Sequence, residues 1–356
     1  MSQKYNLLAF GASYGSLLGM KLLAAGHDVR LVCLPDEAAL FNKDGARVRL
    51  PVRGREELVE MDSRNLSGKL SASGPADVNV ADYDMVILAM QEPQYRSPGV
   101  RELLNDVAKA KVPCMSIMNM PPLPFLARIP GIDATTLTGC YTDASVWSNF
   151  DNDLMTLASP DPQAFRPPEE PTNVLQVSLP TNFKVAPFAC DAHTKILRDL
   201  QEGIENFRLE VDGESLALPV KLKSHDSVYV PLAKWCMLMT GNYRCVLADG
   251  ARSIKDSVHS DLEASRAVYE WVGELCRRLG AAPQDQVPFE KYANAANGLA
   301  KPSSAARALE GGAQNIERLD RVVKTLADQL GMQNDVVDAT VAMVDARLEA
   351  NRRAAA

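Results

Sequence analysis

The stretch KYNLLAFGASYGSLLGMKLLAAGHDVRLVCL, residues 4–34, decides the fold of this chain. The apolar run from Lys4 to Phe10 ends in a glycine-containing turn, and Ser16 to Leu23 has helical character. Gly26 is a typical residue for ending a helix, and Asp28 to Leu34 has the pattern of a second buried strand. Strand, helix and strand within about thirty residues make a βαβ unit with a right-handed crossover. The sequence therefore predicts the start of a parallel, Rossmann-type sheet.

Two more apolar runs continue this pattern, at Asp84–Met90 and Pro113–Met118, and a helical segment, Val100–Ala110, lies between them. Continuous apolar runs of this kind are typical of strands that are covered on both faces. We expect small antiparallel strands in the polar stretch from Arg47 to Ala76. A surface loop is expected over Ser159–Thr172, because this segment is rich in proline and acidic residues. The next segments are predicted as strands over Val174–Phe188 and a helix over His193–Phe207.

From Val228 onward the pattern is helical. The helical stretches are Val228–Leu247, Asp261–Leu279, Ile316–Leu330 and Val336–Arg352. With 356 residues the chain is also longer than one compact core usually accommodates. We therefore predict an α/β fold: a Rossmann-type parallel-sheet domain over residues 1–224, followed by an all-α domain over residues 225–356.

Composition places the chain among ordinary globular proteins, with 46% hydrophobic and 23% charged residues. A formal net charge of -7 argues against nucleic acid or an anionic membrane surface as the main partner. The seven cysteines form no CxxC pair, and the four histidines lack metal-ligand spacing. We therefore expect reduced thiols and no metal. The N-terminus reads directly into a strand, without a signal peptide, and no apolar run reaches about 18 residues, so we expect a cytoplasmic protein.

The turn after the first strand has the pattern of a dinucleotide site. Its residues Gly11, Ala12, Ser13, Tyr14 and Gly15 would place backbone N–H groups and a helix N-terminus against a pyrophosphate. Ser13 stands where a central glycine is expected. The alternative is that the two glycines only allow a tight turn. The position of the turn within a βαβ unit favours binding of NADP or NAD.

The end of the second strand normally distinguishes the two cofactors, because an acid there binds the ribose of NAD and a base accommodates the phosphate of NADP. Cys33-Leu34-Pro35-Asp36 provides neither clearly. Asp36 can instead cap the next helix. Arg30 and Lys43 do not decide the matter, and the choice of cofactor stays open.

Gly15-Ser16-Leu17-Leu18-Gly19, followed by residues 24–32 (AAGHDVRLV), resembles the start of the ketopantoate reductase family. Further matches fall in the same order along almost the whole chain, apart from an apparent insertion at Asn149–Asn173. The resemblance implies that Lys234 is the catalytic lysine. It implies that substrate is bound by Asn119, which ends a strand, by Asn242, which shares a helix with Lys234, and by Ser303, which lies in Pro302-Ser303-Ser304. It also implies cofactor contacts by Gln91, Gln94 and Asn119.

The residues themselves agree with this chemistry. Delivery of hydride to a carbonyl leaves an alkoxide, which a nearby ammonium can stabilise and protonate. Lys234 is a lone charge in an apolar helical stretch, although a lysine reaching the surface would give the same pattern. Asn242 follows it by eight residues, on the same helix face, and Gly241 would allow a ligand to come close. For Asn119, Asn242 and Ser303, the alternatives are a turn residue, a buried structural amide and a helix N-cap.

Several positions depart from the family. Counted without gaps from Pro302-Ser303-Ser304, and equally from the terminal helix ending at Gly331, the acidic substrate-binding position falls on Asn315. Glu317 would replace it only after a two-residue slip. Gln91 stands where the family has a lysine. Met120 replaces the glycine that follows Asn119. Loss of a charged hydrogen-bond partner shifts substrate preference strongly, so we expect a substrate other than ketopantoate.

We therefore expect an NAD(P)-dependent oxidoreductase of ketopantoate-reductase type that interconverts a 2-oxo acid, or a related carbonyl compound, and its alcohol. One alternative is an opine-type dehydrogenase that reduces an imine, with His225 as its histidine. The other is a non-catalytic NAD(P)-binding sensor, which would need none of Lys234, Asn242 and Ser303. The expected partners are a small-molecule substrate and, as an assembly to be tested, a second copy of the chain in a homodimer, without nucleic acid or membrane.

Overall fold

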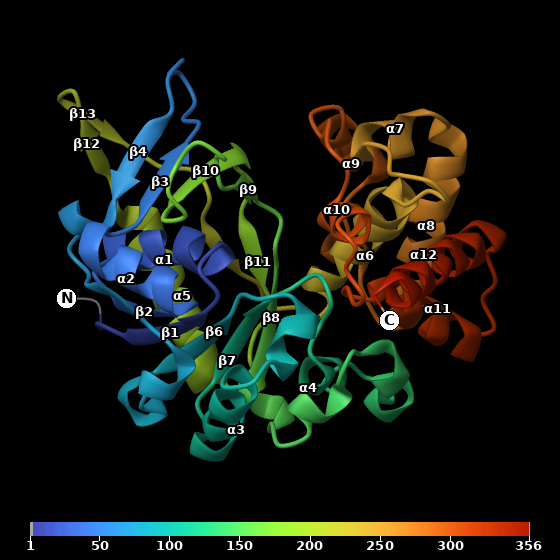
Figure 1. The fold of residues 1–356 in the computed structure, drawn as a ribbon, viewed down its shortest axis with the longest axis horizontal. Helices are drawn as coiled ribbons and strands as arrows, with labels where there is room; N and C mark the ends of the chain where they lie inside the picture. The colour runs from blue at the N-terminus through green and yellow to red at the C-terminus, as the bar shows by residue number, and fades with distance from the viewer. Residues whose placement is uncertain (1–2, 356) are drawn as a thin grey trace. The chain divides into compact units, whose positions relative to one another are not determined.

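The first part of the chain forms the predicted βαβ unit in the computed structural model, which describes residues 3–355 (Figure 1). β1 (Asn6–Phe10) lies parallel to β2 (Asp28–Val32), and α1 (Tyr14–Ala24) connects the two strands. Every residue of α1 after Tyr14 is buried, which explains why the sequence of this helix is apolar on all sides. The predicted Rossmann-type start is confirmed.

The main sheet has eight strands in the order β14-β11-β8-β7-β6-β1-β2-β5. The pairs from β5 through β2, β1, β6 and β7 to β8 are parallel, whereas β11 pairs with β8 in the antiparallel direction. The chain passes from β1 to β2 and β5 on one side and then returns to β6 on the other side of β1. This reversal makes the carboxyl ends of β1 and β6 the switch point at which open α/β sheets bind ligands. The remaining strands of the sheet are β5 (Leu70–Ser73), β6 (Met85–Leu88), β7 (Cys114–Ile117), β8 (Met155–Ser159), β11 (Phe183–Val185) and β14 (Leu222–Ser224).

Helices of the first part agree closely with the sequence pattern. α3 spans Val100–Ala110, the predicted range, and α5 (Asp191–Asn206) matches the helix predicted over His193–Phe207. α5 packs against α1, and α2 (Pro35–Asp44) packs against β5.

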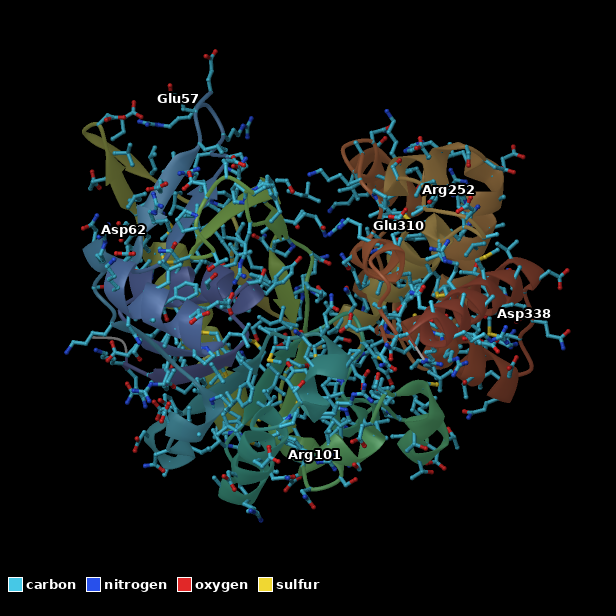
Figure 2. The ribbon with its side chains drawn as sticks, in the orientation of Figure 1. Glu57, Asp62, Arg101, Arg252, Glu310 and Asp338 are labelled. Atoms are coloured by element: carbon cyan, nitrogen blue, oxygen red, sulfur yellow. The ribbon has the colours of Figure 1, made fainter. Side chains whose placement is uncertain are left out.

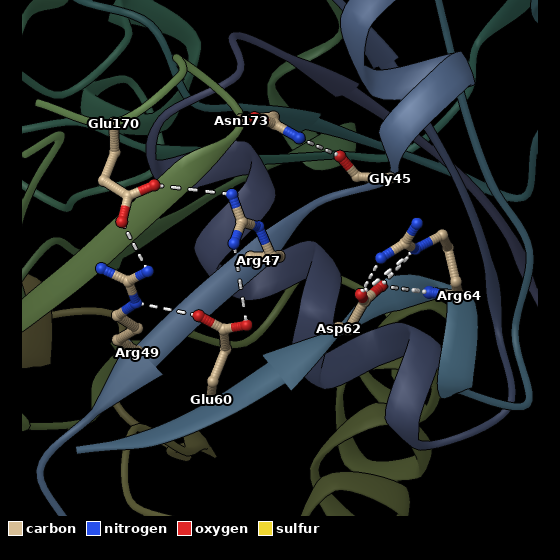
Figure 3. A network of polar contacts seen from close by, with 8 residues as sticks. All are labelled: Gly45, Arg47, Arg49, Glu60, Asp62, Arg64, Glu170 and Asn173. Atoms are coloured by element: carbon tan, nitrogen blue, oxygen red, sulfur yellow. Dashed lines mark hydrogen bonds and ion pairs between the residues drawn. The ribbon is translucent and has the colours of Figure 1, made fainter. Parts of the chain in front are cut away.

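A second sheet has the strand order β4-β3-β10-β9 and is held by charged side chains. Glu60 and Glu170 both pair with Arg49, at 2.8 and 2.6 Å (Figure 3). Two predictions need correction here. Leu70–Ser73 was expected in an antiparallel decoration but joins the main sheet parallel to β2, and the loop expected over Ser159–Thr172 contains β9. The strands of this sheet and of a separate hairpin are β3 (Arg47–Leu50), β4 (Val59–Asp62), β9 (Gln163–Phe165), β10 (Val174–Leu179), β12 (Leu209–Val211) and β13 (Glu214–Leu216).

The second part of the chain is helical, as predicted. α11 and α12 are joined by an ion pair of Lys324 with Asp338 at 2.6 Å (Asp338 is labelled in Figure 2). The helix expected over Val228–Leu247 is interrupted: α6 covers only Ala233–Met237, and a wider π-helical turn follows over Leu238–Asn242. The helices are α4 (Leu123–Leu126), α6, α7 (Ile254–His259), α8 (Leu262–Arg278), α9 (Phe289–Ala296), α10 (Ser304–Glu310), α11 (Leu319–Gln329) and α12 (Asp335–Ala354).

The chain divides into two compact units. The first comprises residues 1–90, 94–118 and 146–228, and the second comprises residues 91–93, 119–145 and 229–356. The main boundary thus lies after Val228 rather than after residue 224, and the helical unit also contains two segments that we predicted in the α/β domain. Within residues 3–355, no helix is both long and apolar enough to cross a membrane.

Candidate active site

A pocket in the second unit brings together residues that are far apart in the sequence. Asn119 follows β7, Asn242 ends the π turn, and Gln91 comes from the short segment after β6. The prediction that these three residues share a site agrees with their common place in this pocket. The complete lining consists of Gln91, Asn119, Leu238, Asn242, Tyr243, Ser304, Ala305, Ile316 and Glu317.

Glu317 supplies the carboxylate of the pocket, although its residue is only 8% exposed. Burial, the largest cause, and the charge of nearby Glu92 raise its pKa from the ordinary 4.5 to about 7. Hydrogen bonds from the Glu92 backbone, the Asn119 side chain and the Met120 backbone limit this rise. The Glu92 N–H donates to the Glu317 carboxylate at 3.4 Å. A carboxyl that is poised near neutral pH can accept a hydrogen bond from a ligand hydroxyl or take up a proton.

Asn315 does not line this pocket. Its side-chain oxygen accepts a hydrogen bond from Arg352 at 3.4 Å. Glu317, two residues later, lines the pocket instead. The sequence offered Glu317 only as this two-residue alternative.

Ser303 acts as the N-cap of α10. Its hydroxyl accepts from the Ala306 N–H at 3.1 Å and donates to the Asn242 carbonyl at 2.7 Å. The residue is 2% exposed, and its single proton is used by Asn242. Ser303 therefore positions the Asn242 segment, whereas the exposed Ser304 lines the pocket. The N-cap interpretation of Ser303 is confirmed.

The π turn before Asn242 has an identifiable cause in Tyr292, a residue that the sequence analysis did not single out. The Tyr292 hydroxyl donates to the Met237 carbonyl at 3.1 Å, the group that would accept from the Gly241 N–H in a regular helix. A Cβ on Gly241 would collide with this hydroxyl. The close approach that glycine allows at position 241 is therefore that of Tyr292, and not that of a ligand.

This wider turn changes which residues share a helix face. A regular α-helix turns about 100° per residue, so Lys234 and Asn242 would lie about 80° apart around it. Because the π turn accommodates one extra residue, the two residues are separated by the equivalent of seven regular helix positions. The angle between them around the helix axis is then about 20°. Lys234 is half-buried and precedes the lining residue Leu238 by four positions, but it is not itself among the nine lining residues.

Tyr243 is a second residue that the sequence analysis missed. It lines the pocket, and its hydroxyl donates to the Glu317 carbonyl at 2.7 Å and accepts from the Leu319 N–H at 3.0 Å. The side chain is buried, and burial raises its pKa far above 10. Tyr243 thus holds the backbone of Glu317 as a neutral phenol. The apolar helical pattern of Val228–Leu247 gave no signal for this contact.

The glycine turn lies in the first unit, at the carboxyl end of β1. Gly11 has a φ of +95°, and a Cβ there would lie 2.9 Å from the Ala89 carbonyl, so only glycine fits between the ends of β1 and β6. In the described structure, the first turn of α1 contains no acidic side chain. Its backbone N–H groups can therefore bind an anion without competition, and these residues fit a dinucleotide pyrophosphate. Gln94 is exposed and belongs to the same unit.

In residues 3–355, no cluster of three or more His, Cys, Asp or Glu side chains is arranged to hold a metal ion.

Comparisons with known proteins identify the fold. No family model matches the sequence, and no curated protein matches it. Among solved structures, the chain is similar to 2-dehydropantoate 2-reductase from Methylococcus capsulatus (TM-score 0.68, 12% identity, covering 98% of each chain). It is similar to D-mandelate dehydrogenase in a ternary complex with NADH and anilino(oxo)acetate (TM-score 0.64, 12% identity, covering 98% of this chain and 99% of the other). A third is a dimeric ketopantoate reductase from Staphylococcus aureus (TM-score 0.59, 9% identity, covering 97% and 99%). The chain has the ketopantoate reductase fold.

Proposed function

We propose that this protein is an NAD(P)-dependent oxidoreductase that transfers a hydride between the nicotinamide and a 2-oxo acid or related carbonyl compound. The observation that carries the proposal is the grouping of Asn119, Asn242 and Glu317 in one pocket, whose lining residue Leu238 follows Lys234 by four positions. Two amides and a carboxyl can bind the oxygens of an oxo acid and its alcohol, and a lysine can supply the proton. The similar structures include two classes of enzyme whose names describe this chemistry.

The turn from Gly11 to Gly15 is proposed to hold the dinucleotide. The amides at the start of α1 would bind the pyrophosphate, and Gln91, Gln94 and Asn119 are proposed as further contacts. When bound, the cofactor supplies or accepts the hydride. The protein's own part is to place the substrate carbonyl, to exclude water and to provide a proton.

Lys234 is proposed as the general acid and base. As the carbonyl is reduced, negative charge develops on its oxygen, and an ammonium within hydrogen-bond reach stabilises that charge and then donates the proton. In the reverse direction the amine accepts the proton of the alcohol. Asn242, aligned with Lys234 by the π turn, would orient the same oxygen.

Glu317 changes what we expect of the substrate. We expected discrimination against ketopantoate because Asn315 replaced an acid, but the pocket retains a carboxyl through Glu317. Gln91 and the buried Met120 still depart from the family pattern. A substrate with a hydroxyl near its 2-oxo acid group therefore fits the pocket, and ketopantoate belongs in the first set of compounds to be tested.

The two alternative functions would require different residues. An opine-type enzyme would be expected to use histidine, but no histidine is among the nine lining residues, and the His225 N–H donates to the Val185 carbonyl in the first unit. A sensor would not require Lys234.

A homodimer stays a prediction, which sedimentation velocity would test.

The proposed function is tested by a screen of 2-oxo acids, imines and secondary alcohols with both nicotinamide cofactors, followed by Lys234→Met. The variant should lose about 10²-fold or more in turnover with little change in cofactor affinity. Lys255→Met, an exposed lysine on α7, is the matched control and should be unaffected. Cofactor binding without turnover of any compound would favour the sensor, and full activity of Lys234→Met would place the proton donor elsewhere.

A further inference from the structure

Charged residues from outside β2 lie beside the carboxyl end of this strand. In a dinucleotide-binding sheet this end lies near the adenosine ribose. Cys33 and Leu34 follow the strand directly; Cys33 is half-buried and Leu34 is 70% exposed, and neither carries a charge. Beside them, Glu37 in the first turn of α2 pairs with Arg166 at 2.6 Å. Arg166 is more than a hundred residues away in the sequence and lies in the segment that has the appearance of an insertion.

The segment that carries Arg166 is anchored on both sides within the first unit. Before it, the Pro162 carbonyl accepts a hydrogen bond at 2.8 Å from the hydroxyl of Tyr14, a residue of the glycine turn. After it, Glu170 pairs with Arg49 at 2.6 Å, and Asn173 donates to the Gly45 carbonyl at 2.8 Å (Figure 3). These contacts run from the proposed pyrophosphate site to the end of α2 and to β3. Arg166 is therefore held in place by the fold.

The two charges lie close to the strand end. The side chains of Glu37 and Arg166 are only 17% and 31% exposed, so their interaction is less screened than that of a surface pair. Burial, the largest cause, and the charge of Glu37 raise the pKa of the neighbouring Cys33 thiol to about 11, and the charge of Arg166 limits this rise. The charges of Glu37 and Arg166 therefore both act on Cys33, the first residue after β2.

We propose that Glu37 and Arg166 select the cofactor and make this protein prefer NADH to NADPH; the inference rests on the proposed function. The Glu37 carboxylate would accept hydrogen bonds from the ribose hydroxyls, and Arg166 would hold that carboxylate in position. A 2′-phosphate at the same place would bring a second negative group against Glu37. Repulsion between Glu37 and this phosphate would lower the affinity for NADPH, so the site would select against that cofactor.

Arg166 also provides the means of reversing this preference. Its Nε is buried and has no hydrogen-bond partner among the described residues, and the guanidinium pairs with Glu37 through Nη1. A guanidinium has five N–H donors and binds phosphate well. If the charge of Glu37 is removed, Arg166 becomes a free cation beside the ribose site. NADPH should then gain affinity through Arg166.

The experiment measures the dissociation constants of NADH and NADPH for the full chain by calorimetry. The unmodified protein should bind NADH at least about tenfold more tightly, the size of effect that one charge-assisted contact gives. Glu37→Gln should shift the ratio about tenfold or more toward NADPH, and adding Arg166→Gln should abolish that gain. Glu60→Gln is the matched control, because it neutralises another arginine-paired acid of the same unit, and its ratio should stay unchanged.

The possible outcomes distinguish failure of the cofactor inference from failure of the proposed function on which it rests. Tighter binding of NADPH by the unmodified protein, or an unchanged ratio in Glu37→Gln, would overturn the cofactor inference alone. Failure of both nucleotides to bind the unmodified protein would overturn the proposed function together with it. If Glu37→Gln does not fold, as judged by its melting curve, Arg166→Gln alone provides the test: NADH should bind several-fold more weakly, and equal affinity would contradict the inference.

Discussion

The Tyr292 hydroxyl donates a hydrogen bond to the Met237 backbone carbonyl at 3.1 Å, from a helix about fifty residues further along the chain. This contact replaces one bond of the α6 helix ladder, and the helix widens at that point into the π turn that ends at Asn242. Wider turns of this kind are often found at functional sites. From helix geometry, we predict that the extra residue in this turn brings Asn242 close to alignment with Lys234.

Tyr292→Phe should therefore reduce activity as well as stability. Loss of the hydrogen bond should cost about 1 kcal/mol of unfolding free energy, and kcat/KM should fall further because Asn242 rotates away from the Lys234 face. Tyr269→Phe is the matched control: the buried Tyr269 stacks on Tyr292, and its hydroxyl donates to the Val287 carbonyl at 2.8 Å. Equal losses of kcat/KM in the two variants would contradict a role for the π turn.

Glu317 should make stability depend on pH. Its pKa is raised to about 7 in the folded protein from 4.5, so folding favours the protonated form. The stabilisation is complete below the unfolded pKa and is lost as pH rises through about 7. Glu317→Gln removes this titration, and the variant should gain stability relative to the unmodified protein between about pH 5 and about pH 8. Urea unfolding at both pH values measures the change.

Asn315→Ala is the control for that experiment, because its side chain contacts Arg352 and carries no titrating group. It should leave both the pH dependence of stability and kcat/KM close to those of the unmodified protein. Glu317→Gln should also remove a bend near pH 7 from the profile of kcat/KM against pH. A variant that keeps the bend would assign it to another group, of which Glu92 is the nearest acid.

The dinucleotide site is best tested at Ser13. The substitution Gly15→Asp is unsuitable, because a Cβ on Gly15 lies within 3.8 Å of apolar atoms of Ala9, Leu31 and Ala89, and a carboxylate there would be buried. Ser13 is the half-buried N-cap of α1, a position where aspartate is a favourable residue. Ser13→Asp should keep the melting temperature.

In the same variant, the added carboxylate would face the phosphates at the helix N-terminus, so affinity for NADH should fall about tenfold or more. Ser13→Ala separates the effect of charge from loss of the hydroxyl and should bind much better than the aspartate variant. Undiminished NADH affinity in Ser13→Asp would place the dinucleotide elsewhere. Calorimetry measures all three proteins.

The sequence alone determined the features that depend on neighbouring residues. The βαβ unit, the buried strands β6 and β7 and the range of α3 follow from periodicity and from where glycines and polar residues stop it. Such patterns are local, because a residue's burial in a helix or strand repeats every few positions. Asn119 and Asn242 were indicated by the family resemblance; Asn119 also ends a predicted strand, and Asn242 follows Lys234 by eight residues.

Only the tertiary structure decided how these elements meet. The helix predicted through Val228–Leu247 is interrupted because Tyr292 reaches it from a distant segment. Glu317 rather than Asn315 lines the pocket, where its carboxylate accepts from the Glu92 N–H and its carbonyl accepts from the Tyr243 hydroxyl. Arg166 reaches the end of β2 through a segment held by Tyr14 and Glu170. Contacts of this kind leave no periodic pattern, because each depends on one side chain arriving from elsewhere in the fold.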